Sequence, residues 1–401
     1  MNHWGRALIA LGLAALFFRA KMLYVVFYAA AAIYAFARFA LPRGFASLSV
    51  TRHIDGNRLF VGESTTIRIR VRNSSWVPMS WVGVLDQLPP VLTAGSEQRA
   101  IVALAPLGQA EWSYTLSGKR RGVHAVGPIT LEAGDPFGIE LLTGRTALVD
   151  QVVVYPRIHP LVELGLPARL PIGPFRTPTR LFEDPARATG AREYRPGDPF
   201  KRIHWKLSAK GERLYVKEYQ PTITLDTAIL LNLNLPEYEA RLRDFRAELG
   251  IEAAASIAYH LGEHKQSLRF ITNGRDPSRP KAEAGEPIRI APRKGTLALT
   301  TILEVLAKIE LGEGRPFDEL INESAASLGW GGTLVIITPE DTEALLHRLT
   351  GLQHKGHTVM LLITGDVRHK EWLGRPALSG LTLHQLRSET EFERLGLRGA
   401  G

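Results

Sequence analysis

The chain contains no cysteine, although it is 401 residues long. This absence excludes disulfide bonds, thiolate metal sites and cysteine nucleophiles. The sequence also lacks a glycine-rich phosphate loop after the first strand expected in its C-terminal half, a Gly-x-Ser-x-Gly turn and a His-Glu-x-x-His helix. These patterns supply a phosphate cradle, a serine nucleophile and a pair of zinc ligands. The residues therefore give no support to a dinucleotide enzyme, an α/β-hydrolase or a zinc peptidase of these types.

The composition that is present is that of a folded protein with an excess of positive charge. Hydrophobic residues make up 45% of the chain. The length is typical of two or three domains. The formal net charge of +9 at pH 7 is compatible with nucleic acid, anionic lipid or an acidic protein as a partner.

Two uncharged, strongly apolar runs stand near the N-terminus, at residues 7–18 and 22–37, with Arg19 and Lys21 between them. A membrane-spanning helix needs about 20 apolar residues. The second run reaches that length only if the Arg38 side chain extends toward the membrane surface. We expect a transmembrane helical hairpin over residues 1–45 with its turn near Arg19. The alternative is a cleaved secretory signal peptide, but such a peptide would not need the second run.

The positive charges around these runs predict the membrane orientation. Lys and Arg are enriched on the cytoplasmic side of membrane-spanning segments, which is the positive-inside rule. Both outer ends of the hairpin carry such residues, namely Arg6, Arg38, Arg43, Arg52 and Arg58. Arg19 and Lys21 would lie on the other face and oppose this orientation. We expect the cell inner membrane as the location, with the soluble domains in the cytoplasm.

The next region, residues 46–156, has the pattern of a β-domain. Residues 64–72 alternate apolar and polar side chains with period two, as half-buried strands do. Roughly seven short strands separated by Gly, Pro and Asn turns predict an immunoglobulin-like antiparallel sandwich. Residues 157–190 are rich in Pro, Gly and Arg, which predicts a linker or an extended segment.

Residues 222–401 alternate apolar strands with helices, which predicts a doubly wound α/β sheet. Ligands of such sheets bind beyond the carboxyl ends of the strands. Asn232 and Asn234 follow the first strand, and Thr338 ends a later one. Their oxygens could hold Mg²⁺, but the charge is low for a hard divalent ion. An ordinary strand-to-loop transition explains the same residues, and we expect no bound metal and no cofactor.

The stretch 192–217 is the densest in residues that need a defined position, with eight Lys or Arg against three acids. It contains a Pro-Gly-Asp-Pro turn and, among its aromatic residues, Tyr194, Phe200 and Trp205, which a solvated charged face would not need. We expect a recognition element or a structural joint between domains. The candidate residues are Arg192, Glu193, Tyr194, Pro196, Gly197, Asp198, Arg202, His204, Trp205, Lys206 and, in the strand that follows, Glu218.

Three hypotheses apply to this stretch. In the first, Arg192 and Arg202 pair with Glu193, Asp198 or Glu218 and hold a joint together. In the second, Trp205 is a stacking platform in a basic patch that binds nucleic acid or lipid. In the third, His204 and Asp198 are an acid–base pair of a hydrolase; no nucleophile accompanies them in the sequence.

A second group of residues lies upstream. Arg121 and Gly122 are followed by the box Asp135-Pro136-Phe137-Gly138. Proline at the second position is typical of a β-turn. A strand followed by a turn, with Phe137 packed across it, explains this box without a ligand.

At these two groups the chain resembles the bacterial domain-of-unknown-function family 58. The family's Arg-Glu-Tyr-x-Pro-Gly-Asp stretch corresponds here to residues 192–198, its Arg and Trp to Arg202 and Trp205 in the spacing Arg-x-x-Trp, and its following strand to the run that contains Glu218. We take residues 191–221 as the family's signature motif. The upstream box and the Val154-Tyr155-Pro156 sequence are similar too. The resemblance implies a membrane tether, a von Willebrand factor A-like α/β domain and a MoxR-type AAA+ ATPase as partner, in chaperone-like or envelope-assembly work.

A-like domains often carry a metal-ion-dependent adhesion site, Asp-x-Ser-x-Ser, after the first strand. Here the corresponding run is Asn232-Leu-Asn234-Leu-Pro236, in which two ligand positions are neutral amides and the third is lost. We therefore do not expect metal-dependent adhesion. The resulting expectation is a non-enzymatic, membrane-anchored scaffold or adaptor.

Overall fold

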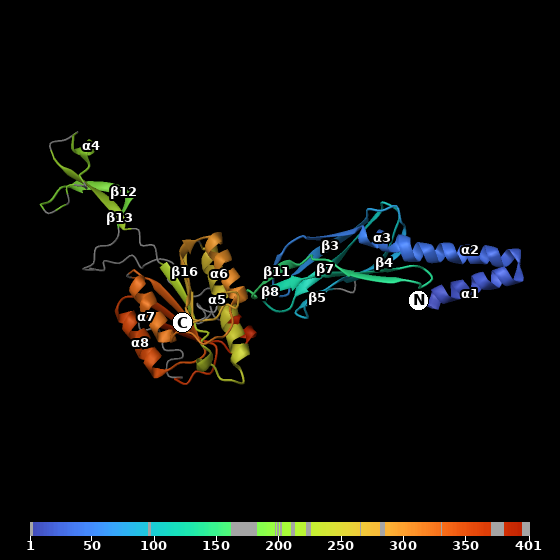
Figure 1. Cartoon of the computed structure of the whole chain (residues 1–401). Coiled ribbons are helices and arrows are strands. Elements are labelled where there is room, and N and C mark those ends of the chain that lie inside the picture. The colour runs from blue at the N-terminus through green and yellow to red at the C-terminus, as the bar shows by residue number, and fades with distance from the viewer. Residues whose placement is uncertain are drawn as a thin grey trace. The chain divides into compact units, whose positions relative to one another are not determined.

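The computed structural model describes residues 3–94, 98–161, 183–196, 198, 200, 203–209, 213–221, 226–264, 266–280, 285–329, 331–369 and 381–394. The chain divides into two compact units (Figure 1). The first comprises Met1–Ile158 with Leu303–Ile309, and the second His159–Ile302 with Glu310–Gly401. Each unit has a hydrophobic core of its own.

The N-terminus folds into two apolar helices, α1 (His3–Phe18) and α2 (Lys21–Ala35), which form a hairpin. The chain turns at Arg19, whose φ is 48°. A Cβ on Gly12 would lie 2.9 Å from the Phe27 ring, so glycine lets the two helices approach closely. One π-helical turn (Phe36–Ala40) joins α2 to α3 (Leu41–Ala46).

One helical run in the described part of the chain, Lys21–Ala46, is long and apolar enough to cross a membrane, at 26 residues. Helix α1 is shorter. Large apolar side chains of both helices are exposed, among them Leu13, Phe17 and Val25. The expectation of an apolar N-terminal helix is confirmed.

The region that follows contains strands β1 to β11, more than the roughly seven expected. The first four-stranded antiparallel sheet has the order β1 (Leu48–Ile54), β3 (Ser64–Asn73), β7 (Gln109–Gly118), β5 (Leu92–Ala94). The second has the order β10 (Leu141–Arg145), β9 (Ile129–Gly134), β4 (Met79–Asp86), β6 (Arg99–Leu104). A smaller sheet joins β2 (Arg58–Phe60), β11 (Asp150–Tyr155) and β8 (Gly122–Val126).

One hydrophobic core holds these sheets together, and the period-two pattern places its side chains. In β3, Ile67, Ile69 and Val71 are buried, whereas the arginines between them are exposed. Val82 and Val84 of β4 belong to the same cluster. Because both four-stranded sheets contribute apolar side chains to one core, the alternating pattern of the sequence is explained by burial of one face of each strand.

A charged centre is buried inside this domain. The side chains of Arg52 and Asp86 are both 0% exposed and are joined by two hydrogen bonds. The Arg52 guanidinium also donates to Asp150 at 2.8 Å and to the Val126 carbonyl at 3.0 Å, and the Tyr114 hydroxyl donates to Asp86 at 2.7 Å. Burial raises the pKa of Asp86, since desolvation disfavours its charged form.

This centre corrects one expectation. Arg52 was counted among the positive charges that flank the membrane hairpin, but it is a core residue of the β-domain. In β1 it shares the inward face with Leu48, Val50 and Ile54. Its charge is paired with the buried carboxylate of Asp86 and the half-exposed carboxylate of Asp150, so it does not belong among the charges that flank the hairpin.

The second unit contains a six-stranded mixed sheet. Its order is β16 (Ile288–Lys294), β15 (Ser267–Thr272), β14 (Asp226–Leu231), β17 (Thr333–Thr338), β18 (Thr358–Ile363), β19 (Leu381–Gln385). All neighbours are parallel except β16, which runs antiparallel to β15. The expected α/β sheet is therefore present, and it is mixed because of an antiparallel edge strand that was not predicted.

Helices cover both faces of this sheet. Helices α7 (Phe317–Ser327) and α8 (Glu343–His354) pack on one face and share a core with β14, β17 and β18. Helix α5 (Arg243–Glu263) packs on the opposite face, where Gly250 approaches Leu231 and Ile337. Helix α6 (Thr296–Lys308) follows β16 along the chain. Buried strands of this kind read as continuous apolar runs, as β14 and β17 do.

Candidate functional site

The signature motif lies on a β-hairpin, called the arm here, which comprises the described residues of 183–221 (Figure 1). Strand β12 (Glu183–Glu193) pairs antiparallel with β13 (Tyr215–Pro221). Between them, the short helix α4 (Trp205–Ser208) is preceded by Ile203, which bridges to Val216. Ile203 and Val216 are 3% and 2% exposed, so they form the small core of the arm.

Strand β12 corrects the expected linker, 157–190, because its first residues lie inside that range. The pairing register shifts between Glu183 and Ala188. Pro185 stands in this stretch and has no N–H to donate to the ladder. The strand was not predicted because the range is rich in proline. Its pairing is irregular in the stretch where Pro185 occurs.

An Arg–Asp pair closes the bend of the motif. The Arg192 guanidinium donates two hydrogen bonds to the two carboxylate oxygens of Asp198, each at 2.7 Å. The Arg195 N–H donates to the same carboxylate at 2.9 Å, and the Asp198 N–H donates to the Arg195 carbonyl at 3.0 Å. The hydrogen bond from Arg192 is the main reason that the pKa of Asp198 falls to about 2.

This pair is partly exposed, because the Arg192 and Asp198 side chains are 41% and 17% accessible. Glu193 pairs with Arg213 at 2.6 Å on the surface. Pro196 is exposed in the bend. Gly197, Arg202 and the side chain of Glu218 lie outside the described residues. The first hypothesis thus holds for Arg192 and Asp198 as partners, but not as a buried pair.

The residues of the hydrolase hypothesis have other contacts. The His204 Nδ1 accepts a hydrogen bond from the Leu207 N–H at 3.2 Å and so caps α4. The His204 N–H donates to the Tyr215 carbonyl at 2.8 Å. Asp198 is bound by Arg192. Within the described part of the arm, no contact joins His204 to Asp198, so the geometry gives this pair no shared chemistry.

The arm leaves most of its large apolar side chains in solvent. Phe200 is 71% exposed and Trp205 65%, while Leu207 and Leu214 are 39% and 43% exposed. Tyr194 stacks on Phe200 with 6.1 Å between ring centroids. Lys206 is exposed beside Trp205. Large exposed apolar patches often mark interaction sites, so these side chains are candidates for contact with a partner. The sequence alone did not distinguish them from Ile203 and Val216, which are buried.

The upstream box is a turn between β9 and β10. Asp135 is 5% exposed, and its carboxylate accepts hydrogen bonds from the Phe137 N–H at 2.8 Å and the Glu140 N–H at 2.7 Å. Pro136 follows Asp135, and Gly138 has a φ of +69°, which favours glycine. Phe137 does not pack across the turn as expected. It is 56% exposed, because the Asp135 carboxylate already closes the turn.

The other two residues of that group lie before and at the start of β8. Arg121 is half-buried in the loop that precedes the strand, and Gly122 begins it. A Cβ on Gly122 would lie 2.8 Å from the His124 ring, and the φ of Gly122 is +148°. Glycine is required there by space and by backbone conformation. Gly122 therefore has a local explanation, whereas the Arg121 guanidinium donates to the Leu306 carbonyl at 2.9 Å and the Ile309 carbonyl at 2.7 Å, far along the chain.

The three residues predicted at the sheet edge do meet there. The Asn232 side-chain amide donates to Thr338 Oγ1 at 3.1 Å and to Glu237 Oε2 at 2.6 Å. The Asn234 amide donates to Glu237 Oε1 at 2.8 Å. Glu237 ends a 3₁₀ turn (Leu235–Glu237). It was not predicted, although it lies five residues after Asn232.

Asn273 completes this network from the end of the neighbouring strand β15. Its amide donates to Asn232 Oδ1 at 3.1 Å, and its oxygen accepts from the Leu233 N–H at 2.7 Å. The buried Tyr238 hydroxyl donates to the Asn232 carbonyl at 2.6 Å, and burial raises the pKa of Tyr238. The side-chain amides donate to the Glu237 carboxylate and to one another, so the polar groups at this edge find hydrogen-bond partners within the network itself.

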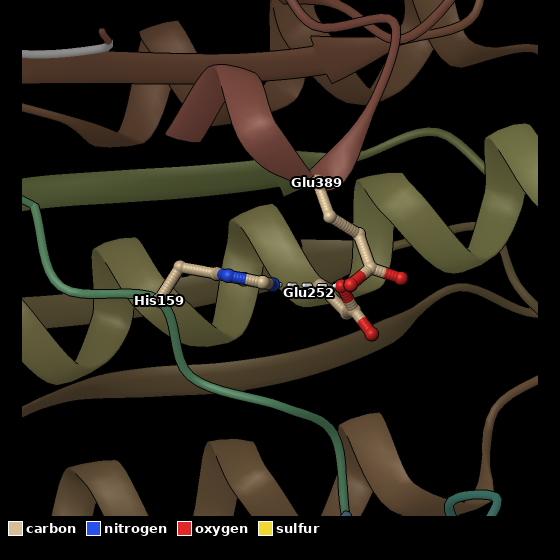
Figure 2. A group of neighbouring side chains, drawn as sticks. All are labelled: His159, Glu252 and Glu389. Atoms are coloured by element: carbon tan, nitrogen blue, oxygen red, sulfur yellow. Dashed lines mark hydrogen bonds and ion pairs between the residues drawn. The ribbon is translucent and has the colours of Figure 1, made fainter. Parts of the chain in front are cut away.

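A third group, His159, Glu252 and Glu389, was not predicted from the sequence (Figure 2). His159 Nε2 lies 2.9 Å from Glu252 Oε2, and one ligand atom from each residue lies within 4.8 Å of the others. His159 lies in the loop after β11, within the range 157–190 that was expected to be a linker. Glu252 is on α5, and Glu389 begins a 3₁₀ turn (Glu389–Arg394). Such separation along the chain leaves no local spacing to detect.

Comparison with known proteins bears on the arm. One family model matches residues 190–287, which include the bend of the arm and the first strand of the α/β sheet. That family is "Protein of unknown function DUF58". The match confirms the expected resemblance to DUF58 over these residues.

A curated relative, the uncharacterized protein YeaD of Bacillus subtilis (strain 168), is 26% identical over 217 residues. The alignment covers 50% of this chain and 52% of YeaD. The chain therefore spans about half the length of this relative.

Solved structures match only a fraction of the chain. A FixG-related protein from Vibrio parahaemolyticus is 12% identical with a TM-score of 0.20, and the match covers 27% of this chain and 96% of that one. The CARDB domain of the PF1109 protein from Pyrococcus furiosus is 13% identical with a TM-score of 0.20, covering 27% of this chain and 94% of that one. Scores of this size assign neither fold nor function.

Proposed function

We propose that this chain is a non-enzymatic, membrane-tethered adaptor that binds a protein partner through the arm. The observation that carries the proposal is the exposure of Phe200 and Trp205, at 71% and 65%, on an element that is itself folded. Aromatic side chains and arginines are enriched in the energetically important parts of protein interfaces. The arm offers both within one short hairpin.

The charges of the arm favour a protein over a nucleic acid or a lipid surface. Arg192 is bound by Asp198, and Arg213 by Glu193. Guanidinium groups that already have carboxylate partners gain less from phosphates than free ones do. Arg195 and Lys206 are exposed beside the aromatic residues. We infer a partner surface with an apolar pocket and an acidic rim.

The partner that the family resemblance implies is a MoxR-type AAA+ ATPase, and we propose an ATPase of this type as the protein bound by the arm. The finer fold assignments belong to the same proposal. The sheet order, with three strands on one side of the β14–β17 boundary and three on the other, supports a von Willebrand factor A-like domain. The shared core of two antiparallel sheets supports an immunoglobulin-like sandwich.

The membrane tether is also part of the proposal. The run Lys21–Ala46 has the length and composition of a spanning helix, and the apolar side chains that the hairpin exposes would be in contact with lipid. We place the β-domain, the arm and the α/β domain in the cytoplasm, since Arg38 and Arg43 follow this helix. An ATP-driven partner requires that side of the inner membrane.

The test is binding of a purified MoxR-type ATPase to the full chain in detergent, with and without ATP. The double variant Phe200→Ala with Trp205→Ala should bind at least about 30-fold more weakly, because interface aromatic residues each contribute about 1–2 kcal/mol or more. Trp76→Ala is the matched control, since Trp76 is 79% exposed in the β-domain. Equal binding by wild type and the double variant would refute docking through the arm.

A further inference from the structure

We propose that His159, Glu252 and Glu389 bind one first-row divalent metal ion, with Zn²⁺ as the preferred ion. The three side chains point toward one another from three separate segments (Figure 2). His159 comes from the loop after β11, Glu252 from the middle of α5, and Glu389 from the 3₁₀ turn after β19. All three residues belong to the second compact unit.

The spacing of the ligand atoms is close to that of a metal site. Zinc binds imidazole nitrogen and carboxylate oxygen at about 2.0–2.2 Å, which puts neighbouring ligands of a tetrahedron about 3.3 Å apart. His159 Nε2 and Glu252 Oε2 are 2.9 Å apart, and the three ligand atoms all lie within 4.8 Å of one another.

Two of the three ligands are held in place. The His159 ring stacks on Phe392 with 4.0 Å between centroids and 6° between planes, and the His159 N–H donates to Ser256 Oγ at 2.9 Å. The His159 and Glu252 side chains are 13% and 9% exposed. Positioned ligands of this kind reduce the entropy lost when a metal binds.

The electrostatics also favour a cation. Glu252 is a nearly buried carboxylate, and a second carboxylate, Glu389, lies beside it. Two carboxylates that share a site repel each other unless a proton or a cation lies between them. A divalent ion would neutralise both charges while the neutral imidazole supplies the nitrogen ligand.

The donor set selects the ion. Mg²⁺ and Ca²⁺ require about six or more oxygen ligands, whereas one imidazole and two carboxylates suit Zn²⁺ and related first-row ions. Three protein ligands leave a fourth position for water. The bound ion would join the segment at His159 to α5 and to the C-terminal 3₁₀ turn, and so stabilise the second unit by binding its folded form.

The experiment is a titration of the full chain with Zn²⁺ by calorimetry. The protein is purified in detergent with a tag that contains no histidine and is stripped with EDTA. We expect one Zn²⁺ per chain and no saturable binding of Mg²⁺ or Ca²⁺. Loss of a supporting residue near a metal costs about 10–100-fold in affinity, so His159→Gln and Glu252→Gln should each weaken binding by about 100-fold or more.

Three controls make the result specific. His347→Gln and Asp244→Asn remove an exposed imidazole and an exposed carboxylate, at 78% and 83% accessibility, and should leave the affinity unchanged. His264→Gln tests the histidine pair at the C-terminal end of α5, His260 and His264, whose rings lie 4.6 Å apart. Loss of binding in that variant, with retention in His159→Gln, would assign the ion to His260 and His264 and overturn the proposal.

Glu389→Gln keeps the test decisive even if a core variant does not fold, because Glu389 is exposed. That variant should retain the melting temperature of the stripped wild type but lose at least about tenfold in Zn²⁺ affinity. Binding of Co²⁺ to the wild type should produce the visible absorption of a four-coordinate or five-coordinate ion. Wild-type protein that binds no stoichiometric Zn²⁺ would refute the site.

Discussion

The β-domain and the arm each contain a two-bonded Arg–Asp pair, but in opposite environments. Arg52 and Asp86 are 0% exposed, whereas Arg192 and Asp198 are 41% and 17% exposed. Burial raises the pKa of Asp86, while hydrogen bonding, mainly from Arg192, lowers that of Asp198. The pKa of the aspartate therefore shifts in opposite directions in the two pairs, because only the Arg52–Asp86 pair is removed from solvent.

The comparison shows that charge density in the sequence does not locate the buried charges. The stretch 192–217 has the highest density, yet its pair is near the surface. Arg52 stands alone among apolar and polar residues of β1 and is the arginine that the core encloses. Removing one partner of a buried ion pair strongly destabilises the folded protein, whereas an exposed pair contributes little to its stability.

The largest effect is expected for Arg52→Ala. This substitution leaves Asp86 buried without its cationic partner, and such losses cost about 3–5 kcal/mol. Hydrogen exchange of the β3 and β7 peptides in the full chain would measure the free energy of opening of the β-domain. An effect below about 1 kcal/mol would contradict the burial of this centre.

The control for that variant is Arg70→Ala on the solvent-facing side of β3. Arg70 pairs with Glu111, and the two side chains are 54% and 42% exposed. Exposed pairs contribute about 0–1 kcal/mol. Equal losses for Arg52→Ala and Arg70→Ala would show that burial does not set the difference.

An intermediate effect is expected for Tyr114→Phe, which removes a single hydrogen bond from the same buried centre. The Tyr114 hydroxyl donates to Asp86 at 2.7 Å. A hydrogen bond to a charged group contributes about 1.5–3 kcal/mol. The same exchange experiment should therefore show a loss in the free energy of opening that lies between those of Arg70→Ala and Arg52→Ala. The absence of any change would show that the Tyr114 hydroxyl does not stabilise this centre.

The smallest and most local effect is expected for Asp198→Asn in the arm. The folded pKa of Asp198 is about 2, against about 3.9 for an unperturbed aspartate. The folded arm thus favours the ionised form, and the contribution is complete above about pH 4 and disappears as the pH falls to about 2. Exchange protection of the arm should differ between wild type and variant at pH 7 and converge on acidification.

The contribution of Asp86 to stability depends on pH in the opposite direction to that of Asp198. Because its folded pKa is raised, the stability linked to its proton is present at low pH and decreases as the pH rises through that pKa. Acidification that loosens the arm should therefore not weaken the β-domain through Asp86. Parallel loss of protection in both regions between about pH 4 and 2 would contradict the assigned directions.

The strands of both domains could be predicted where their burial is regular. The alternation of β3 and the continuous apolar runs of β14, β17 and β18 follow directly from burial of one face or of both. Strand β16 was missed because only its first residues, Ile288 and Ile290, are buried. Helix α7 was not predicted, although Phe317, Leu320 and Ile321 have helical spacing and acidic residues in its first turn favour a helix start.

The site could be predicted only where its residues are near in sequence or lie at strand ends. Asn232, Asn234 and Thr338 meet because carboxyl ends of neighbouring parallel strands share one edge. The partners of a given charge depend on tertiary contacts. The face of β1 that holds Leu48 and Val50 did carry a signal for Arg52, since period two puts it inward, whereas no such signal joins His159 to Glu252, 93 residues away.

The central claim is that the arm is a folded docking element with exposed aromatic residues, and side-chain oxidation footprinting of the full chain tests it most directly. Trp205 should react nearly as fast as Trp76 in the free protein, since they are 65% and 79% exposed. Adding a purified MoxR-type ATPase should protect Trp205 and leave Trp76 unchanged. A Trp205 that is already protected in the free chain would show that the arm is buried against the protein itself and would contradict the account.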